Sequence, residues 1–308
     1  MRLSLAGWLA VGLLAGLSQP STAAITISGY DPNLHDRFTN HSTFIGSGYD
    51  WSGVGRTDEG RWGVLVSPSF ALSAAHLAPS VDSTLRYYPG NDPSSAPVDR
   101  KVIANVSLTQ LGLTASSDLV LSQLSSPATG IAHYPVLSLP SSRQLVGQQL
   151  FVWGASDSPD PPTSMRLGRN EVTAILPAFS DPVLGASTGD VFIYDFDTVN
   201  GLGIDEARAE GGDSGAPSFV VSSQGQLTLA GVHWFQYTAP DNLPGSMGSG
   251  DTLISSFISS INAAMQARGS SERLITITAI PEPSGLGLLV VALAATIGRR
   301  RTRRSSNT

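Results

Sequence analysis

The stretch RWGVLVSPSFALSAAH, residues 61–76, indicates the fold class. Within it Trp62, Val64 and Val66 fall on alternate positions, which is the pattern of a strand with a buried face. A serine–proline pair then marks a turn, and the apolar positions resume in FALS. We therefore expect a β-hairpin that leads into a short turn at His76.

Other short apolar segments, separated by Gly, Pro, Ser and Asp, recur along the middle of the chain and indicate barrels or sandwiches. The expected strands are LRYYP (85–89), KVIANVSL (101–108), DLVLSQL (118–124), QQLFVWGA (148–155), NEVTAIL (170–176), DVFIYDF (190–196), APSFVVS (216–222) and LTLAGVHWF (227–235). One helix is expected over 254–267, where Ile254, Phe257 and Ile261 recur at helical intervals. The prediction is an all-β protein with a short C-terminal helix.

Residues 1–24 have the three-part layout of a secretory signal peptide. Arg2 is followed by an apolar run and by the small-residue stretch STAA, so cleavage after Ala23 and cleavage after Ala24 fit equally well. A buried core helix is the alternative interpretation. We expect an exported protein in which residues 25–42 form an N-terminal segment.

The other end of the chain, PEPSGLGLLVVALAATIGRRRTRR (281–304), combines a Pro-Glu-Pro triplet, an apolar run and five arginines. The run of about 15 apolar residues is short for a permanent membrane span, which needs about 20. This end resembles the PEP-CTERM sorting signal of bacterial exported proteins, through Pro281, Glu282 and Pro283 and through its basic end, Arg299–Arg304. The resemblance implies transient membrane association, processing by an exosortase-type peptidase and a Gram-negative envelope. We expect the protein in the periplasm, at the cell surface or outside the cell, with inner-membrane anchoring before the tail is processed. An ordinary C-terminal anchor is the alternative.

Charge and cysteine content exclude several classes of function. Six of the 18 basic residues lie in the two terminal segments, so 12 remain in the middle of the chain beside nearly all of the 24 acidic residues. Such an acidic body argues against a nucleic-acid or anionic-membrane surface. The chain has no cysteine, which excludes disulfides, thiolate catalysis and cysteine-ligated metal sites.

The segment EGGDSGAP (210–217) carries a candidate nucleophile, Ser214. A nucleophilic serine must sit on a tight turn whose backbone N–H groups point at the developing oxyanion, and glycine permits such a backbone. The N–H groups of Gly212 and Ser214 would be these donors. An ordinary glycine-rich turn is the alternative.

A serine hydroxyl needs a base, and the base needs a carboxylate to orient it. Among five histidines, His76 stands out because it follows the expected hairpin in the segment SAAHL, where the neighbouring alanines are small enough to let the ring lie in a cleft. Asp118 begins the apolar strand DLVLSQL, which would bury its neighbours. Taken singly, a structural histidine and a turn aspartate would be the simpler interpretations.

Taken together, SAAH, SDLVLSQL and GGDSGAP resemble, in this order, the histidine, aspartate and serine motifs of the trypsin/chymotrypsin-like serine proteases. The resemblance covers about residues 43–267. It implies two six-stranded antiparallel β-barrels, at 43–146 and at 147–268 with the helix, and a linker at 269–280. It further implies a serine endopeptidase without cofactor or metal, acting on protein or peptide substrates, with Ser214 as nucleophile, His76 as general base and Asp118 orienting the histidine. A catalytically silent, surface-displayed binding module on the same fold is the competing hypothesis.

Two residues bear on substrate specificity. Arg208 lies near the position that forms the base of the primary pocket in this family, and a cation there would favour an acidic side chain. The segment GVHW, which contains His233, is similar to the glutamyl endopeptidases, in which a histidine contacts the substrate glutamate. Against this, Glu210 could pair with Arg208, and His233 could be a core histidine.

The sequence departs from the family pattern around the serine. Ala216 stands where the family has the second glycine of Gly-Gly-Pro, and no basic cleavage site is followed by an Ile or Val motif whose amine could pair with Asp213. Cleavage after Ala24 would free the amine of Ile25 for this role. The loop DFDTVNGLGIDE (195–206) has acidic residues at calcium-like spacing but lacks the ligand and glycine that an EF-hand loop needs, so we expect a solvated loop.

Overall fold

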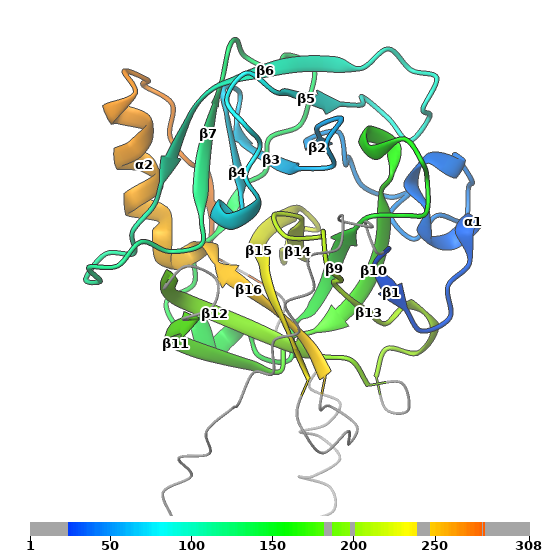
Figure 1. Ribbon diagram of the computed structural model, residues 1–308. Helices are drawn as coiled ribbons and strands as arrows, with labels where there is room; N and C mark the ends of the chain where they lie inside the picture. The colour runs from blue at the N-terminus through cyan, green and yellow to red at the C-terminus, as the bar shows by residue number, and fades with distance from the viewer. Residues whose placement is uncertain (1–23, 182–186, 198–200, 239–246, 279, 281–308) are drawn as a thin grey trace, which may run out of the picture.

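The hairpin of residues 61–76 is confirmed in the computed structural model, as β3 (Trp62–Ser67) and β4 (Phe70–Ser73). The structure describes residues 24–181, 187–197, 201–238, 247–278 and 280. The predicted sorting tail and all of the signal peptide except Ala24 lie outside this part of the chain. Figure 1 shows two β bodies, one above the other, with a helix at one side.

The upper body is a closed antiparallel barrel in the order β2-β3-β4-β7-β6-β5, as the sequence predicts for the first half. The strands besides β3 and β4 are β2 (Val54–Arg56), β5 (Thr84–Tyr87), β6 (Val98–Ser107) and β7 (Val120–Leu124). Both faces of β3 are buried. Leu65 packs in a cluster within the barrel, whereas Trp62, Val64 and Val66 join the larger cluster that also holds residues of the second half.

The lower body is a curled, largely antiparallel sheet with the path β10-β9-β14-β15-β16-β12-β11. Its strands are β9 (Gln149–Gly154), β10 (Arg166–Glu171), β11 (Ala174–Asp181), β12 (Ser187–Asp195), β14 (Pro217–Val221), β15 (Leu227–Thr238) and β16 (Met247–Leu253). A closed barrel joined to a second curled sheet, with little helix, is the chymotrypsin-like double-barrel architecture that the sequence predicts.

In this sheet one predicted strand was wrong and another strand was missed. The expected strand 170–176 is divided, because β10 ends at Glu171 and β11 starts at Ala174. The strand β16 was not predicted, since MGSGDTL lacks the apolar alternation of a typical strand. Its glycines have a packing reason: a Cβ on Gly250 would lie 2.2 Å from the ring of Phe235 on the neighbouring strand.

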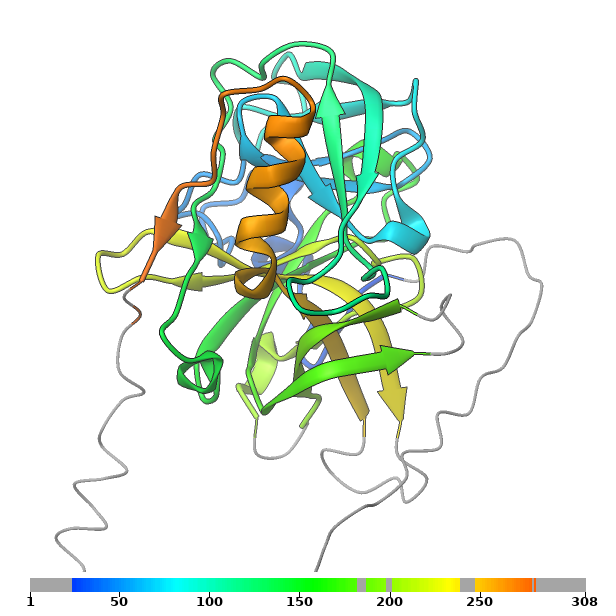
Figure 2. The same ribbon diagram turned by 90° about the vertical axis from the view of Figure 1, so that its left-hand side faces the viewer.

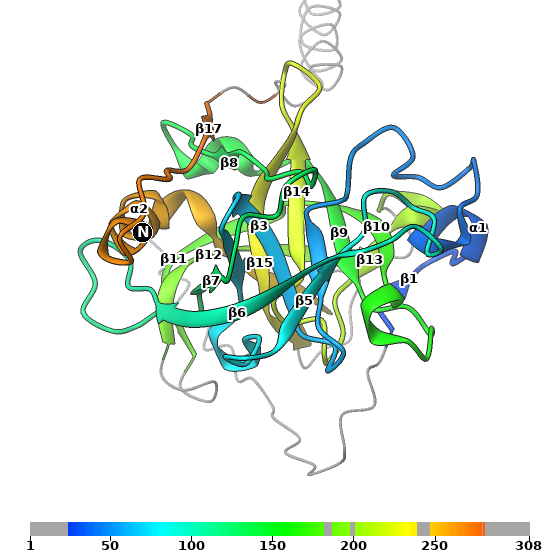
Figure 3. The ribbon, with the colours of Figure 1, turned by 90° about the horizontal axis from the view of Figure 1, so that it is seen from above.

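The segments around the two bodies are tied to the second sheet. Near the N-terminus, β1 (Thr26–Ile27) pairs with β13 (Ala207–Arg208), and the two lie side by side beside β10 in Figure 3. The short helix α1 (Pro32–His35) follows β1 in the chain. In the expected linker, β17 (Thr276–Ile277) pairs in parallel with β8 (Val136–Leu137), which also pairs with β15. Thus β8 belongs to the second sheet although it lies within the predicted first half, because the chain crosses over before residue 147.

The predicted C-terminal helix is present as a 3-10 turn (Ile254–Phe257) followed by α2 (Ile258–Ala267). It stands alongside the first barrel in Figure 2 and buries Phe257, Ile261 and Met265 in the large cluster. This cluster joins the two bodies. Among the residues that the structure describes, no helix is long and apolar enough to cross a membrane.

Candidate active site

Three predicted side chains meet where the two bodies join. Nδ1 of His76 lies 2.7 Å from Oδ2 of Asp118, and Nε2 of His76 lies 2.8 Å from Oγ of Ser214. The backbone N–H of His76 donates to Oδ1 of Asp118 at 2.8 Å. The aspartate thus holds the histidine at two points, which fixes the ring with Nε2 toward the serine.

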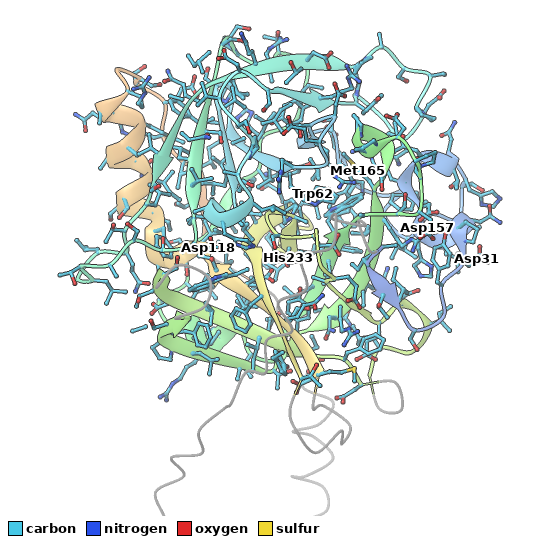
Figure 4. All side chains as sticks on the ribbon, in the orientation of Figure 1. Asp31, Trp62, Asp118, Asp157, Met165 and His233 are labelled. Carbon is cyan, nitrogen blue, oxygen red and sulfur yellow. The ribbon has the colours of Figure 1, made fainter. Side chains whose placement is uncertain are left out.

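Local structure explains these positions. His76 lies in a 3-10 turn (Ala75–Leu77) directly after β4, and Asp118 lies two residues before β7, the barrel neighbour of β4. Ser214 precedes β14 in the second sheet. In Figure 4, Asp118 lies at the level where the two bodies meet. The side chain of Asp118 is 1% exposed while that of His76 is 23% exposed, so the carboxylate is dry and the ring is reachable by a substrate.

The turn that carries Ser214 depends on glycine. Gly212 and Gly215 have φ of 102° and 92°, which disfavour any residue with a Cβ. A Cβ on Gly215 would also lie 2.5 Å from Oγ of Ser73. The turn is held by hydrogen bonds from Gly215 N to His233 O and from Ala216 N to Asp213 O. Within the described part of the chain, the N–H groups of Gly212 and Ser214 have no acceptor, so both are available to an oxyanion.

Asp213, the residue before the serine, is buried beneath the turn. Its Oδ1 accepts from Ala155 N at 2.7 Å and its Oδ2 from Glu210 N at 2.8 Å. Burial raises the pKa of Asp213 to about 6, although these two hydrogen bonds and the charges of His233 and Arg56 oppose the rise. Asp213 therefore anchors the turn through backbone amides.

Ile25, the residue considered for activation, lies beside Asp213. It is 1% exposed, and its backbone N donates to Ala155 O at 3.0 Å. A Cβ on Gly154 would meet both Cβ of Ile25 at 2.5 Å and Oδ2 of Asp213 at 2.8 Å. Gly154 therefore lies between Ile25 and the carboxylate of Asp213, with no room for a side chain.

The two predicted specificity residues have different surroundings. Arg208 is partly exposed and forms an ion pair with Glu210, with Nη2 and Oε1 2.8 Å apart. His233 is 2% exposed, and both of its ring nitrogens are engaged, one by Asp251 and one by the backbone carbonyl of Trp153. The structure therefore leaves Arg208 at an accessible position but encloses His233 in the core.

Asp251 was missed by the sequence analysis. It lies on β16 directly opposite His233 on β15 and is fully buried. The available signal was an acidic residue two positions before the apolar pair Leu253-Ile254, but without a predicted strand it had no assigned face.

The acidic loop 195–206 borders a cavity of about 360 Å³ lined in part by Glu171, Asp195, Asp197 and Glu206. Burial raises the pKa of Glu206, against hydrogen bonds from the backbone N–H groups of Asp197 and Leu202. Among the described residues, no three acidic, histidine or cysteine side chains converge as metal ligands.

Comparison with known proteins agrees with this arrangement. A search of curated proteins found no match. The sequence profile of the trypsin family matches residues 42–248, which is more than half of the chain and contains all three of the side chains that meet between the two bodies. The chain therefore belongs to the trypsin family and is a serine-type peptidase.

Proposed function

We propose that the chain is an exported serine endopeptidase in which Ser214 is the nucleophile, His76 the general base and Asp118 the residue that orients His76. The observation that carries this proposal is the continuous set of hydrogen bonds from Asp118 through His76 to Ser214, at 2.7 and 2.8 Å. A serine whose hydroxyl lies within hydrogen-bonding distance of an oriented imidazole is activated for attack on a carbonyl carbon.

The chemistry follows from these contacts. Oγ of Ser214 attacks the peptide carbonyl while Nε2 of His76 takes its proton. The carbonyl oxygen becomes an oxyanion, to which the N–H groups of Gly212 and Ser214 donate, each donor typically being worth about 10²- to 10³-fold in rate. His76 then gives the proton to the leaving amine. Water, deprotonated by His76, releases the acyl group and regenerates Ser214.

The test compares Ser214→Ala with the wild-type chain in casein digestion and in labelling by a fluorophosphonate. Ser214→Ala is expected to lose both, with a fall in kcat of about 10⁴- to 10⁶-fold and no loss of fold. Ser223→Ala, an exposed serine in the turn between β14 and β15, is the matched control and should retain both. Unchanged turnover in Ser214→Ala would sink the assignment. A wild-type chain that neither labels nor digests casein would instead favour the silent binding module.

Export and sorting are part of the same proposal. Removal of the signal peptide, residues 1–24, would leave the N-terminal segment 25–42, the two halves 43–146 and 147–268, and the linker 269–280 ahead of the tail at 281–304. An exosortase-type peptidase would process this tail at the membrane. The mass of the protein recovered from the envelope and medium tests both cuts: an intact N-terminus contradicts export, and an intact tail contradicts processing.

Activation by the new N-terminus is supported by the position of Ile25. Cleavage after Ala24 would create an ammonium group one hydrogen bond away from the Ala155 carbonyl and close to Asp213. A cation there would compensate the buried carboxylate. N-terminal sequencing of the active enzyme should begin at Ile25, and a different start removes this part of the proposal.

A preference for acidic residues before the scissile bond rests on Arg208, because His233 is enclosed. The guanidinium of Arg208 is shared with Glu210, so a substrate carboxylate would have to compete with that side chain. A peptide-library digest should show enrichment of Glu and Asp that is lost in Arg208→Ala. Preferred cleavage after basic or aromatic residues would contradict it.

A further inference from the structure

The ring of His233 lies between two hydrogen-bond acceptors. Nδ1 is 2.7 Å from Oδ1 of Asp251, and Nε2 is 2.7 Å from the carbonyl oxygen of Trp153. A neutral imidazole has a single N–H and can satisfy only one acceptor, whereas an imidazolium has two. The hydroxyl of Tyr194 also lies 3.2 Å from Nδ1, but Oδ1 of Asp251 is nearer, so both close contacts are satisfied when His233 carries two protons and Asp251 is ionised.

The surroundings of Asp251 agree with an ionised carboxylate opposite this ring. Oγ of Ser218 donates to Oδ2 of Asp251, and the hydroxyl of Tyr194 donates to Oδ1 at 3.2 Å. A carboxylate that accepts from two hydroxyls and from a ring N–H has no need of a proton of its own. His233 and Asp251 thus form a fully buried ion pair across neighbouring strands.

His233 is also bonded directly to the turn that carries Ser214 on its C-terminal side, and it is linked to the N-terminal side through the segment Trp153–Ala155. Its backbone carbonyl accepts from Gly215 N at 3.0 Å, and its backbone N–H donates to Ala216 O at 2.9 Å. Its ring holds the carbonyl of Trp153, and two residues further on Ala155 N donates to the carboxylate of Asp213. The segments before and after Ser214 are therefore fixed to the same histidine, one through its main chain and one through its ring.

We propose that His233 is a positioning residue whose imidazolium form clamps the turn 212–216 in the shape that directs the N–H groups of Gly212 and Ser214 at an oxyanion. This inference rests on the proposed role of Ser214. His233 acts through the turn and makes no contact with the substrate, which replaces the substrate-binding role suggested by the GVHW motif. Figure 4 shows it close to the junction of the two bodies.

The electrostatic surroundings favour the imidazolium. Burial alone would lower the pKa of His233, but the charge and hydrogen bond of Asp251, the charge of Asp213 and the carbonyl of Trp153 together raise it. The groups that face the ring are Asp251 on β16, Tyr194 on β12 and Asp213 in the turn. The clamp therefore persists to a higher pH than an ordinary histidine would allow, and it is lost as the pH rises through the raised pKa, when one acceptor loses its donor.

The kinetic test is the variant His233→Gln. Its side-chain NH₂ can donate to Asp251 or to the carbonyl of Trp153, but not to both. Per active site titrated with fluorophosphonate, we expect kcat to fall about tenfold or more, since each misdirected oxyanion donor can cost 10²- to 10³-fold, while KM changes little. The alkaline decline of wild-type kcat should vanish in this variant. His35→Gln is the matched control, because His35 is equally buried and also faces an aspartate, Asp205, but lies far from the turn in sequence and does not bond it. Wild-type kcat and pH profile in titrated His233→Gln would overturn the proposal.

A second measurement does not depend on the folding of His233→Gln or on activity. In the full-chain Ser214→Ala variant, nitrogen-detected NMR of the histidine rings should show both nitrogens of His233 still protonated above the ordinary histidine pKa of about 6.5. A neutral tautomer of His233 at neutral pH would overturn the inference while leaving the role of Ser214 untouched. Failure of Ser214 to label would contradict the proposed function while leaving this spectrum as an independent result.

Discussion

Each of the two bodies contains one histidine–aspartate pair with nearly the same geometry. In the first barrel Nδ1 of His76 is 2.7 Å from Asp118, and in the second sheet Nδ1 of His233 is 2.7 Å from Asp251. The difference lies at the other nitrogen. Nε2 of His76 faces the hydroxyl of Ser214, whereas Nε2 of His233 faces a backbone carbonyl.

This second partner decides what each histidine can do. A hydroxyl can donate or accept, so in the mechanism that we propose Nε2 of His76 accepts the proton of Ser214. A carbonyl only accepts, so Nε2 of His233 must carry a proton, and the carboxylate of Asp251 accepts a second one from Nδ1. Exposure follows the same division, at 23% for the side chain of His76 and 2% for that of His233. One pair is built to move a proton and the other to hold it.

Replacing either aspartate by asparagine gives the largest expected effects, on kcat for Asp118 and on stability for Asp251. In Asp118→Asn the amide would place its NH₂ against Nδ1 of His76, so that the ring carries its proton on Nε2 and cannot accept one from Ser214. We expect kcat to fall about 10⁴-fold with little change in the melting temperature. The matched variant Asp251→Asn should act mainly on stability, lowering the free energy of unfolding by roughly 3–5 kcal/mol because it leaves a buried imidazolium unpaired. Equal loss of activity and equal loss of stability in the two variants would contradict the distinction.

The same contrast explains what the sequence could predict. His76, Asp118 and Ser214 each stand beside a local signal: a hairpin, an apolar strand and a glycine turn. The closed barrel was predictable for the same reason, because its strands carry dense apolar residues such as those of 62–66.

The enclosure of His233 has no comparable local signal. It depends on the pairing of β15 with β16, whose glycine- and serine-rich sequence hides both the strand and Asp251. It also depends on the approach of Trp153 from β9, 80 residues away along the chain. The motif GVHW therefore predicts that a histidine is present but not which atoms surround it.

The next largest effect is the contribution of Asp213, which faces the charge of His233, to the pH dependence of stability. Its pKa is raised from 3.8 to about 6, so folding favours its protonated form. The corresponding stability is present below about pH 4 and is lost as the pH rises through about 6. The measurement is the unfolding free energy of Ser214→Ala minus that of Ser214→Ala/Asp213→Asn. We expect this difference to decrease by roughly 3 kcal/mol from pH 3.5 to pH 7.5. A difference that grows with pH would mean that a cation pairs with Asp213 more closely than His233 and Arg56 do.

The smallest effect is expected from Gly154→Ala, which tests the segment that links the His233 ring to the turn 212–216. Gly154 lies between Trp153, which accepts from His233, and Ala155, which donates to Asp213. In Gly154→Ala the new Cβ would overlap Cβ of Ile25 and Oδ2 of Asp213, and relief of such overpacking typically costs about 1–3 kcal/mol. We expect this loss of stability together with a several-fold lower kcat. The displaced carboxylate of Asp213 would shift the turn 212–216 and with it the N–H groups that face the oxyanion. Gly48→Ala, where a Cβ would meet no atom within 4 Å, is the control. A Gly154→Ala enzyme that loses stability but keeps its full kcat would show that the turn keeps its shape without this link, and that its main-chain bonds to His233 are sufficient.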